Sequence, residues 1–129
     1  MTDKTREAME LRSQTFCPNC TEAILMTYAK ELGLTEDQAR NLGSNFGGGM
    51  KCGSVCGAIT GGLSVLGGLG ISDPTSVAYF RRKMTENHDG MMNCADLLRV
   101  NMQNGGQKKP HCDAMIAEAI ELIEEMRQK

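Results

Sequence analysis

Apolar and polar positions recur with helical periodicity along most of the chain, and the twenty residues from 52 to 71 include no charged residue. Seven of these twenty positions are glycine. Each interior glycine costs a helix roughly 1 kcal/mol relative to alanine, so burial has to offset a local penalty of several kcal/mol. Small residues, among them Gly53, Gly57 and Gly61, fall along one side at helical spacing. The pattern predicts a buried central helix that is entered through a hinge at residues 47–49.

Start and stop signals elsewhere predict six further helices, at residues 2–12, 20–32, 36–45, 74–87, 94–103 and from Pro110 onward. The clearest signal is the capping box formed by Thr35 and Gln38, and Gly33 is the expected C-cap of the helix before it. No stretch alternates convincingly with period two. The predicted fold is therefore all-α, a compact helical bundle around the glycine-rich central helix.

The length of 129 residues suits a single helical domain, residues 1–129, in which residues 1–15 form a loosely attached N-terminal helix. The net charge of -2 gives no basic surface of the kind that binds nucleic acid. The charged first residues do not resemble a signal peptide, and the glycine-rich stretch lacks the aromatic and basic flanks of a membrane span. We therefore expect a cytoplasmic protein with no nucleic-acid partner and no membrane span.

Six cysteines in a reducing compartment point to metal or redox chemistry rather than to a disulfide framework. Cys20, Cys94 and Cys112 each follow a polar turn residue and are expected in the first turn of an apolar-faced helix. Free backbone N–H groups and the helix dipole stabilise a thiolate there, which lowers the thiol pKa. Cys56 is expected inside the central helix, one turn after Cys52. Because these apolar faces share one core, we expect the sulfurs of Cys20, Cys56, Cys94 and Cys112 to lie near one another.

Three other residues are candidates for the same site. Cys17 and Cys20 form a CxxC sequence, although the preceding strand that a thioredoxin-like motif needs is not visible. Cys52 lies one expected helical turn before Cys56, close enough to share a metal ion. His111 borders the last of the six cysteines and is either a metal ligand or proton donor or, more simply, a helix cap.

Taken together, the cysteines resemble a known pattern: Cys20, then the run from Cys56 to Gly61 (CGAITG), then Cys94, then Cys112. This arrangement is similar to the C_GCAxxG_C_C family of small proteins, and the resemblance covers about residues 17–126. Members of that family are called redox-active on the strength of their cysteines. The family also resembles the iron–sulfur-associated region of split-Soret cytochromes. The resemblance implies a redox or metal site at the four pattern cysteines, with Cys17 and Cys52 outside the pattern.

The sequence leaves three functions open. In the leading hypothesis, a redox-active protein uses the four cysteines to hold an iron–sulfur cluster or another metal ion or, without a cofactor, cycles between dithiol and disulfide. The second is a non-redox protein that holds Zn(II) with four sulfurs. The third is a helical interaction module whose cysteines are small buried hydrophobic residues. The redox hypothesis requires an electron partner that the sequence does not identify, and a homo-oligomer is compatible with all three.

Overall fold

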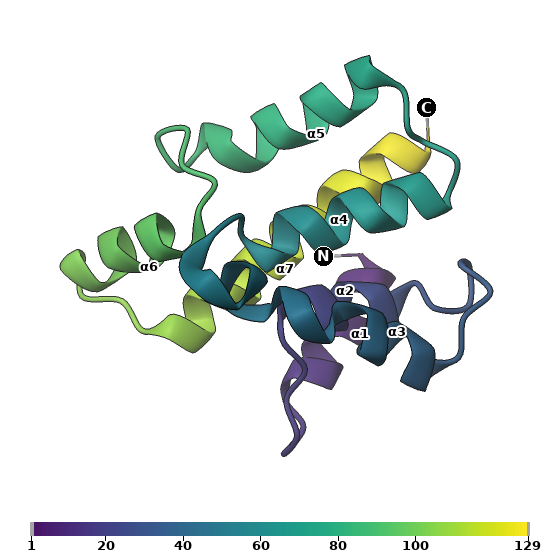
Figure 1. The fold of residues 1–129 in the computed structure, drawn as a ribbon, viewed down its shortest axis with the longest axis horizontal. Helices are drawn as coiled ribbons and strands as arrows, with labels where there is room; N and C mark the ends of the chain where they lie inside the picture. Colours follow the sequence, from purple (N-terminus) through teal and green to yellow (C-terminus); the bar gives the residue numbers. More distant parts are fainter. Residues whose placement is uncertain (1, 129) are drawn as a thin grey trace.

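Figure 1 shows the fold as a computed structural model, which describes residues 2–128. The described residues form seven α-helices: α1 (Asp3–Arg12), α2 (Cys20–Thr27), α3 (Glu36–Gly43), α4 (Gly57–Gly68), α5 (Pro74–Glu86), α6 (Cys94–Gln103) and α7 (Lys108–Arg127). Two short helical turns, η1 (Ser44–Phe46) and η2 (Gly49–Gly53), connect α3 to α4. Within residues 2–128 there is no strand, and the β-type pairing is limited to an isolated antiparallel bridge between Val55 and Asn93. The prediction of an all-α fold is confirmed.

Side chains close the N-terminal ends of four helices by accepting a hydrogen bond from a first-turn N–H; these caps are Thr2, Asn19, Thr35 and Asp73. The predicted capping box of Thr35 and Gln38 is present, and Asn19 and Glu22 form a second one at the start of α2. The α2 helix is shorter than predicted, because it ends at Thr27 and the chain continues in turns to residue 33. For these helices, local sequence signals therefore predict the first residue more accurately than the last residue.

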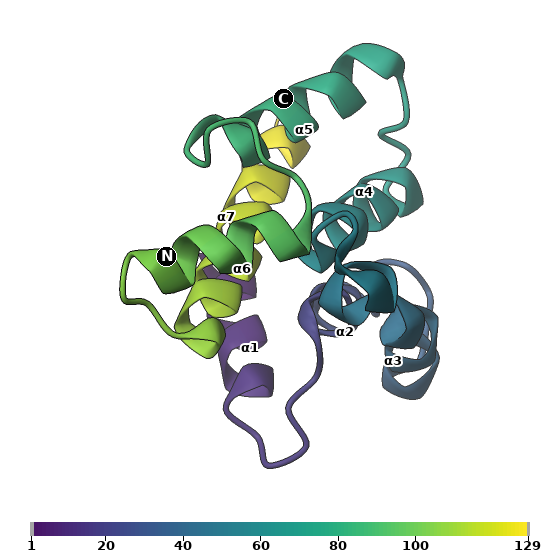
Figure 2. The ribbon, with the colours of Figure 1, turned by 60° about the vertical axis from the view of Figure 1, so that its left-hand side comes forward.

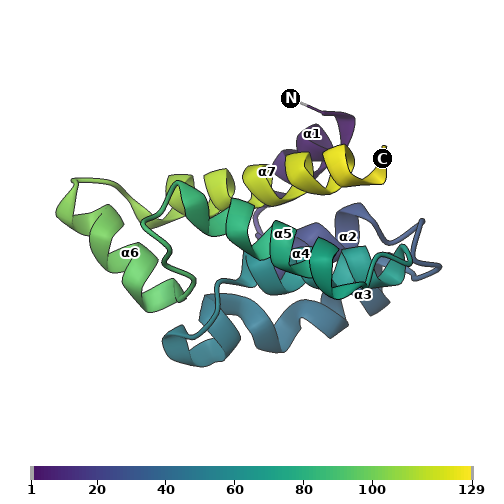
Figure 3. The same ribbon diagram turned by 90° about the horizontal axis from the view of Figure 1, so that it is seen from above.

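The core lies where α2, α4 and α7 meet, and α1 covers α2 and α7 on their outer side (Figures 1 and 2). Ile24 of α2, Ile59 and Leu66 of α4, and Ile116 and Ile120 of α7 are fully buried there. The α6 helix lies at one end of the molecule, beside the start of α7 (Figure 3). The glycine-rich helix α4 is thus central and buried, as predicted.

The α4 helix packs through its glycines against neighbouring backbone. A Cβ atom built on Gly61 would lie 3.2 Å from the Thr21 Cα, and one built on Gly57 would lie 3.2 Å from the Phe46 carbonyl oxygen. The Thr21 hydroxyl donates a hydrogen bond of 2.9 Å to the Gly57 carbonyl, which joins α2 to the start of α4. The close approach that the small-residue stripe predicts is therefore present at both glycines.

The predicted entry into the central helix is wrong. Four consecutive residues, 48–51, have φ between +59° and +68°, so the chain makes a left-handed turn instead of a hinge into a helix. Left-handed geometry costs a non-glycine residue roughly 1–2 kcal/mol, and Met50 and Lys51 both adopt it here. The surrounding packing holds this turn in place: a Cβ atom on Gly49 would lie 2.7 Å from the Cys94 Cβ.

The boundary of α4 corrects the prediction for two cysteines. Cys56 has an extended ψ of 133° and precedes the helix, which begins at Gly57. Its backbone N–H donates a hydrogen bond of 2.8 Å to the Met92 carbonyl, so it pairs with a distant segment instead of continuing a helix. Cys52 directly follows the left-handed turn and has a φ of -141°. Cys52 and Cys56 therefore do not share a helical face.

The N-terminal helix α1 packs against α7 and α2 and buries Thr5 and Ala8. At its C-terminal end, Arg12 forms an ion pair with Asp113 of α7, with 2.7 Å between Nε and Oδ1. The most apolar helix of the bundle, α4, has twelve residues. Among the helices described, none has both the length and the apolar character needed to cross a membrane.

Candidate functional site

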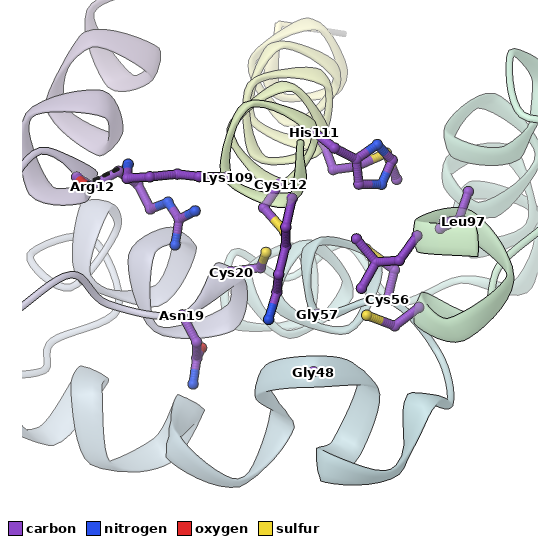
Figure 4. Close-up of a pocket in the computed structure, with 14 residues that line it drawn as sticks. Arg12, Asn19, Cys20, Gly48, Cys56, Gly57, Leu97, Lys109, His111 and Cys112 are labelled. Atoms are coloured by element: carbon purple, nitrogen blue, oxygen red, sulfur yellow. Dashed lines mark hydrogen bonds between the residues drawn. The ribbon is translucent and has the colours of Figure 1, made fainter. Parts of the chain in front are cut away.

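The four pattern cysteines line one cavity of about 260 Å³, where the N-terminal ends of α2, α4, α6 and α7 meet (Figure 4). Cys20 is the first residue of α2, and Cys94 is the first residue of α6. Cys56 directly precedes α4, and Cys112 lies in the second turn of α7. Residues that are far apart in the sequence thus line one cavity.

Cys20 and Cys112 line the same cavity, and each has the largest effect on the pKa of the other. The neighbouring Cys112 raises the pKa of Cys20 above the ordinary thiol value, and burial raises it further. Cys20 in turn lowers the pKa of Cys112, and the positive charges of Arg12 and Lys108 lower it as well. Cys112 is therefore the more acidic thiol of the pair, and Cys20 is the less acidic one.

The position of Cys112 differs from the prediction. The α7 helix begins at Lys108, two residues before the predicted start at Pro110, so Cys112 is the fifth residue of the helix. Free N–H groups occur only in the first turn of a helix. The low pKa of Cys112 thus has a different cause from the predicted one: the contact with Cys20 comes first, and the neighbouring cations follow.

Cys56 and Cys94 lie on either side of the isolated β-bridge. The Cys56 N–H donates to the Met92 carbonyl at 2.8 Å, and the Cys94 N–H donates to the Ser54 carbonyl at 2.7 Å. Burial raises the pKa of Cys56 to about 11, and it also raises the pKa of Cys94. The predicted lowering by the helix start is therefore wrong for Cys94, because desolvation outweighs the dipole.

Cations surround the cavity. Arg12, Lys108 and Lys109 line it, and its lining includes no carboxylate among the residues described. Arg12 is only 8% exposed, and its guanidinium donates to the Pro18 carbonyl and to the Asp113 carboxylate, both at 2.7 Å. This positive environment favours thiolates and other anions inside the cavity.

Sequence reasoning missed these cations. The pair Lys108–Lys109 stands shortly before Cys112, so a basic pair beside a candidate cysteine was the available signal. Arg12 carries no such signal. Its partner Asp113 lies 101 positions away along the chain, and only the packing of α1 against α7 brings the two together.

His111 also lines the cavity, and its predicted capping role is wrong. It is the fourth residue of α7, whose cap position is Gln107. Its ring stands edge-on to that of His88, with 6.4 Å between the centroids, and the His88 Nε2 lies 3.0 Å from a Glu118 carboxylate oxygen. Burial lowers the pKa of His111, and the nearby His88 lowers it further.

Cys17 and Cys52 are exposed and do not line the cavity. The Cys17 Sγ donates to the Pro18 carbonyl at 3.5 Å, and the Cys52 Sγ donates to the Gly49 carbonyl at 3.6 Å. The structure therefore separates the six cysteines into four that share the cavity and two that face solvent.

The thiols of the cavity are the donors that iron–sulfur clusters and zinc use, but they are not arranged as a metal site. Within residues 2–128, no three His, Cys, Asp or Glu side chains are positioned to hold a metal ion together. The chemical type of the donors suits a metal, whereas their present arrangement does not.

Comparison with known proteins identifies a family. Residues 18–126 match the model of the family described as "Putative redox-active protein (C_GCAxxG_C_C)". Neither the curated proteins nor the solved structures contain a significant match. The matched residues span most of the chain and include all four cysteines of the cavity, whereas Cys17 lies just outside them. The chain therefore belongs to the C_GCAxxG_C_C family, whose general character is redox activity.

Proposed function

We propose that this protein is a dithiol–disulfide redox protein in which Cys20 and Cys112 are the reacting pair. The observation that carries the proposal is that the two cysteines line the same cavity and shift each other's pKa in opposite directions, which makes Cys112 the more acidic thiol. Thiol–disulfide exchange needs a thiolate as nucleophile and a second thiol close enough to resolve the mixed disulfide. Membership of a redox-active family supports the same general chemistry.

The reduction of a substrate disulfide proceeds in two exchange steps. The Cys112 thiolate attacks one substrate sulfur, which breaks the substrate S–S bond and releases the other sulfur as a thiolate. Cys20 then loses its proton and attacks the Cys112 Sγ, which releases the second substrate thiolate and leaves a Cys20–Cys112 disulfide. Two electrons pass to the substrate, and its two sulfurs end as thiols. An external dithiol returns the protein to its reduced form.

The other lining residues have supporting roles in this proposal. Arg12 and Lys108 stabilise the thiolate of Cys112 by their charge. Cys56 and Cys94 have raised pKa values and stay protonated at neutral pH, so they are poorer nucleophiles than Cys112. The cavity thus favours one reactive thiolate among four cysteines.

Disulfide mapping tests the proposal. Reduced protein is oxidised anaerobically with diamide, quenched in acid, alkylated and analysed by peptide mass spectrometry. Wild type is compared with Cys17→Ser, in which no CxxC sequence competes for Cys20, and with Cys52→Ser as a matched control at an exposed cysteine. We expect a Cys20–Cys112 disulfide in Cys17→Ser and in the control. Free Cys20 and Cys112 thiols in oxidised Cys17→Ser would refute the proposal.

A second candidate function is iron–sulfur cluster binding by Cys20, Cys56, Cys94 and Cys112. It is favoured by the four thiols and three cations of the cavity, whose described lining holds no carboxylate. Four thiolates are the ligand set of small iron–sulfur clusters. The side chains would have to turn to ligate a cluster together, because they do not form a metal site as they stand.

Anaerobic reconstitution with iron and sulfide, followed by metal analysis and a visible spectrum, tests this candidate. Bound iron and sulfide with visible absorbance would support it, and a colourless protein without iron would contradict it. A colourless protein that binds zinc tightly would instead favour the non-redox Zn(II)-binding function. Thiols that react only after unfolding would favour the interaction module with buried cysteines.

A further inference from the structure

We propose that Cys17 is the exposed thiol through which the Cys20–Cys112 disulfide exchanges with the dithiol of a partner protein. This inference rests on the proposed dithiol function and adds the point of electron entry. Cys17 is exposed, whereas Cys20 lies three residues further along and lines the cavity. The CxxC sequence thus contains one thiol that faces solvent and, three residues later, one thiol of the cavity.

Arg12 holds the segment of Cys17 and Pro18 next to α7. The Pro18 carbonyl accepts hydrogen bonds from the Cys17 Sγ at 3.5 Å and from the Arg12 Nη1 at 2.7 Å. The Nε of the same guanidinium donates to Asp113, the residue that follows Cys112 in α7. One buried side chain therefore ties the segment that carries Cys17 to the part of α7 that carries Cys112.

The exchange step balances without an added oxidant. The Cys17 thiol gives its proton to solvent and attacks the Cys20 Sγ, so the Cys17–Cys20 bond forms while the Cys20–Cys112 bond breaks. Cys112 leaves as a thiolate, and no electrons are gained or lost. The partner dithiol then attacks the Cys17 Sγ and releases the Cys20 thiolate. The second partner thiol breaks the mixed disulfide, so the partner is oxidised by two electrons and the protein is reduced.

The surface around Cys17 favours a protein as the source of this dithiol. Phe16 directly precedes Cys17 and is 82% exposed, so a large apolar ring stands beside the accessible thiol. The Arg40 Nη2 donates to the Phe16 carbonyl at 2.7 Å, which fixes the backbone at that point to α3. An exposed aromatic residue on an anchored segment gives a protein partner an apolar contact.

Reduction kinetics test the exchange. The Cys20–Cys112 disulfide is prepared in wild type, in Cys17→Ser and in Cys52→Ser, and its reduction by reduced thioredoxin, used as a probe protein dithiol, is followed by quenched alkylation. Cys52 is a matched control because it is also exposed and also donates to a nearby carbonyl. We expect Cys17→Ser to be reduced at least about tenfold more slowly than wild type and Cys52→Ser to match wild type. Equal rates in all three proteins would overturn the inference.

A second variant tests whether Cys17 reaches Cys20 at all. Oxidised Cys112→Ser should contain a Cys17–Cys20 disulfide within the peptide of residues 13–30, and a free Cys20 thiol there would also overturn the inference. The two proposals fail differently. The absence of a Cys20–Cys112 disulfide in Cys17→Ser refutes the dithiol function itself. Its presence, with reduction rates that do not depend on Cys17, refutes only the role of Cys17.

Discussion

Cys56 and Cys94 are diagonal neighbours across the isolated β-bridge, because Cys56 pairs with Met92 and Cys94 pairs with Ser54. Diagonal neighbours in antiparallel pairing lie roughly 7–8 Å apart on one face, which suits two residues that line the same cavity. The pairing also fixes the start of α4 relative to the start of α6. Two backbone hydrogen bonds thus position half of the cavity's cysteines.

Gly57→Ala should destabilise the protein by roughly 1–3 kcal/mol through overpacking. An added Cβ would lie 2.7 Å from the Thr21 Oγ1 and 3.2 Å from the Cys20 Cβ. Gly67→Ala in the same helix is the matched control, since its Cβ would meet nothing within 4 Å. Helix propensity predicts that this control is neutral or stabilising by up to about 1 kcal/mol. Chemical denaturation measures both, and equal unfolding free energies would contradict the packing argument.

Cys112 should be the most readily alkylated cysteine of the cavity at neutral pH in the reduced, metal-free protein. The neighbouring Cys20 lowers the pKa of Cys112, so the Cys20→Ala variant should move the alkylation midpoint of Cys112 to higher pH. Rates measured against pH, with each cysteine identified by mass spectrometry, check this expectation. A midpoint of Cys112 that is the same in both proteins would show that Cys20 does not control it.

Arg12→Ala should lower the unfolding free energy by about 1–3 kcal/mol, because it removes the two charged hydrogen bonds of 2.7 Å that Arg12 donates to the Pro18 carbonyl and to the Asp113 carboxylate. Arg99→Ala provides a control, since Arg99 is 61% exposed and pairs with Asp96 within one helix. Exposed pairs of this kind contribute about 0–1 kcal/mol. Thermal or denaturant unfolding of both variants measures the difference. If both variants lose the same unfolding free energy, the ion pair between Arg12 and Asp113 does not stabilise the packing of α1 against α7.

His111 should make the stability of the protein depend on pH in the acidic range. Its pKa in the folded protein is lower than the ordinary 6.5, so the unfolded chain binds the proton more readily. Stability is therefore lost as the pH falls below that ordinary value. We expect wild type to lose stability relative to His111→Gln between about pH 7 and pH 5. If the unfolding free energies of the two proteins change with pH in the same way, burial does not disfavour the charged His111 ring.

Local signals in the sequence were sufficient for much of the fold. The capping box of Thr35 and Gln38 and the start of α6 at Cys94 are found where the sequence predicts them. These features depend on hydrogen bonds among residues a few positions apart, which composition and spacing reveal. The apolar faces that follow Cys20 and Cys94 likewise predicted that the helices share one core.

Only the tertiary structure decided which cysteines lie in the same cavity and which of their thiols is the most acidic. Cys56 lies outside the helix because its N–H pairs with Met92, a residue of another segment. Cys112 is the more acidic thiol because Cys20 lines the same cavity and α1 brings Arg12 near. Each of these contacts joins segments that are distant in the sequence. Packing determines how such segments meet, whereas helical periodicity determines only which faces are apolar.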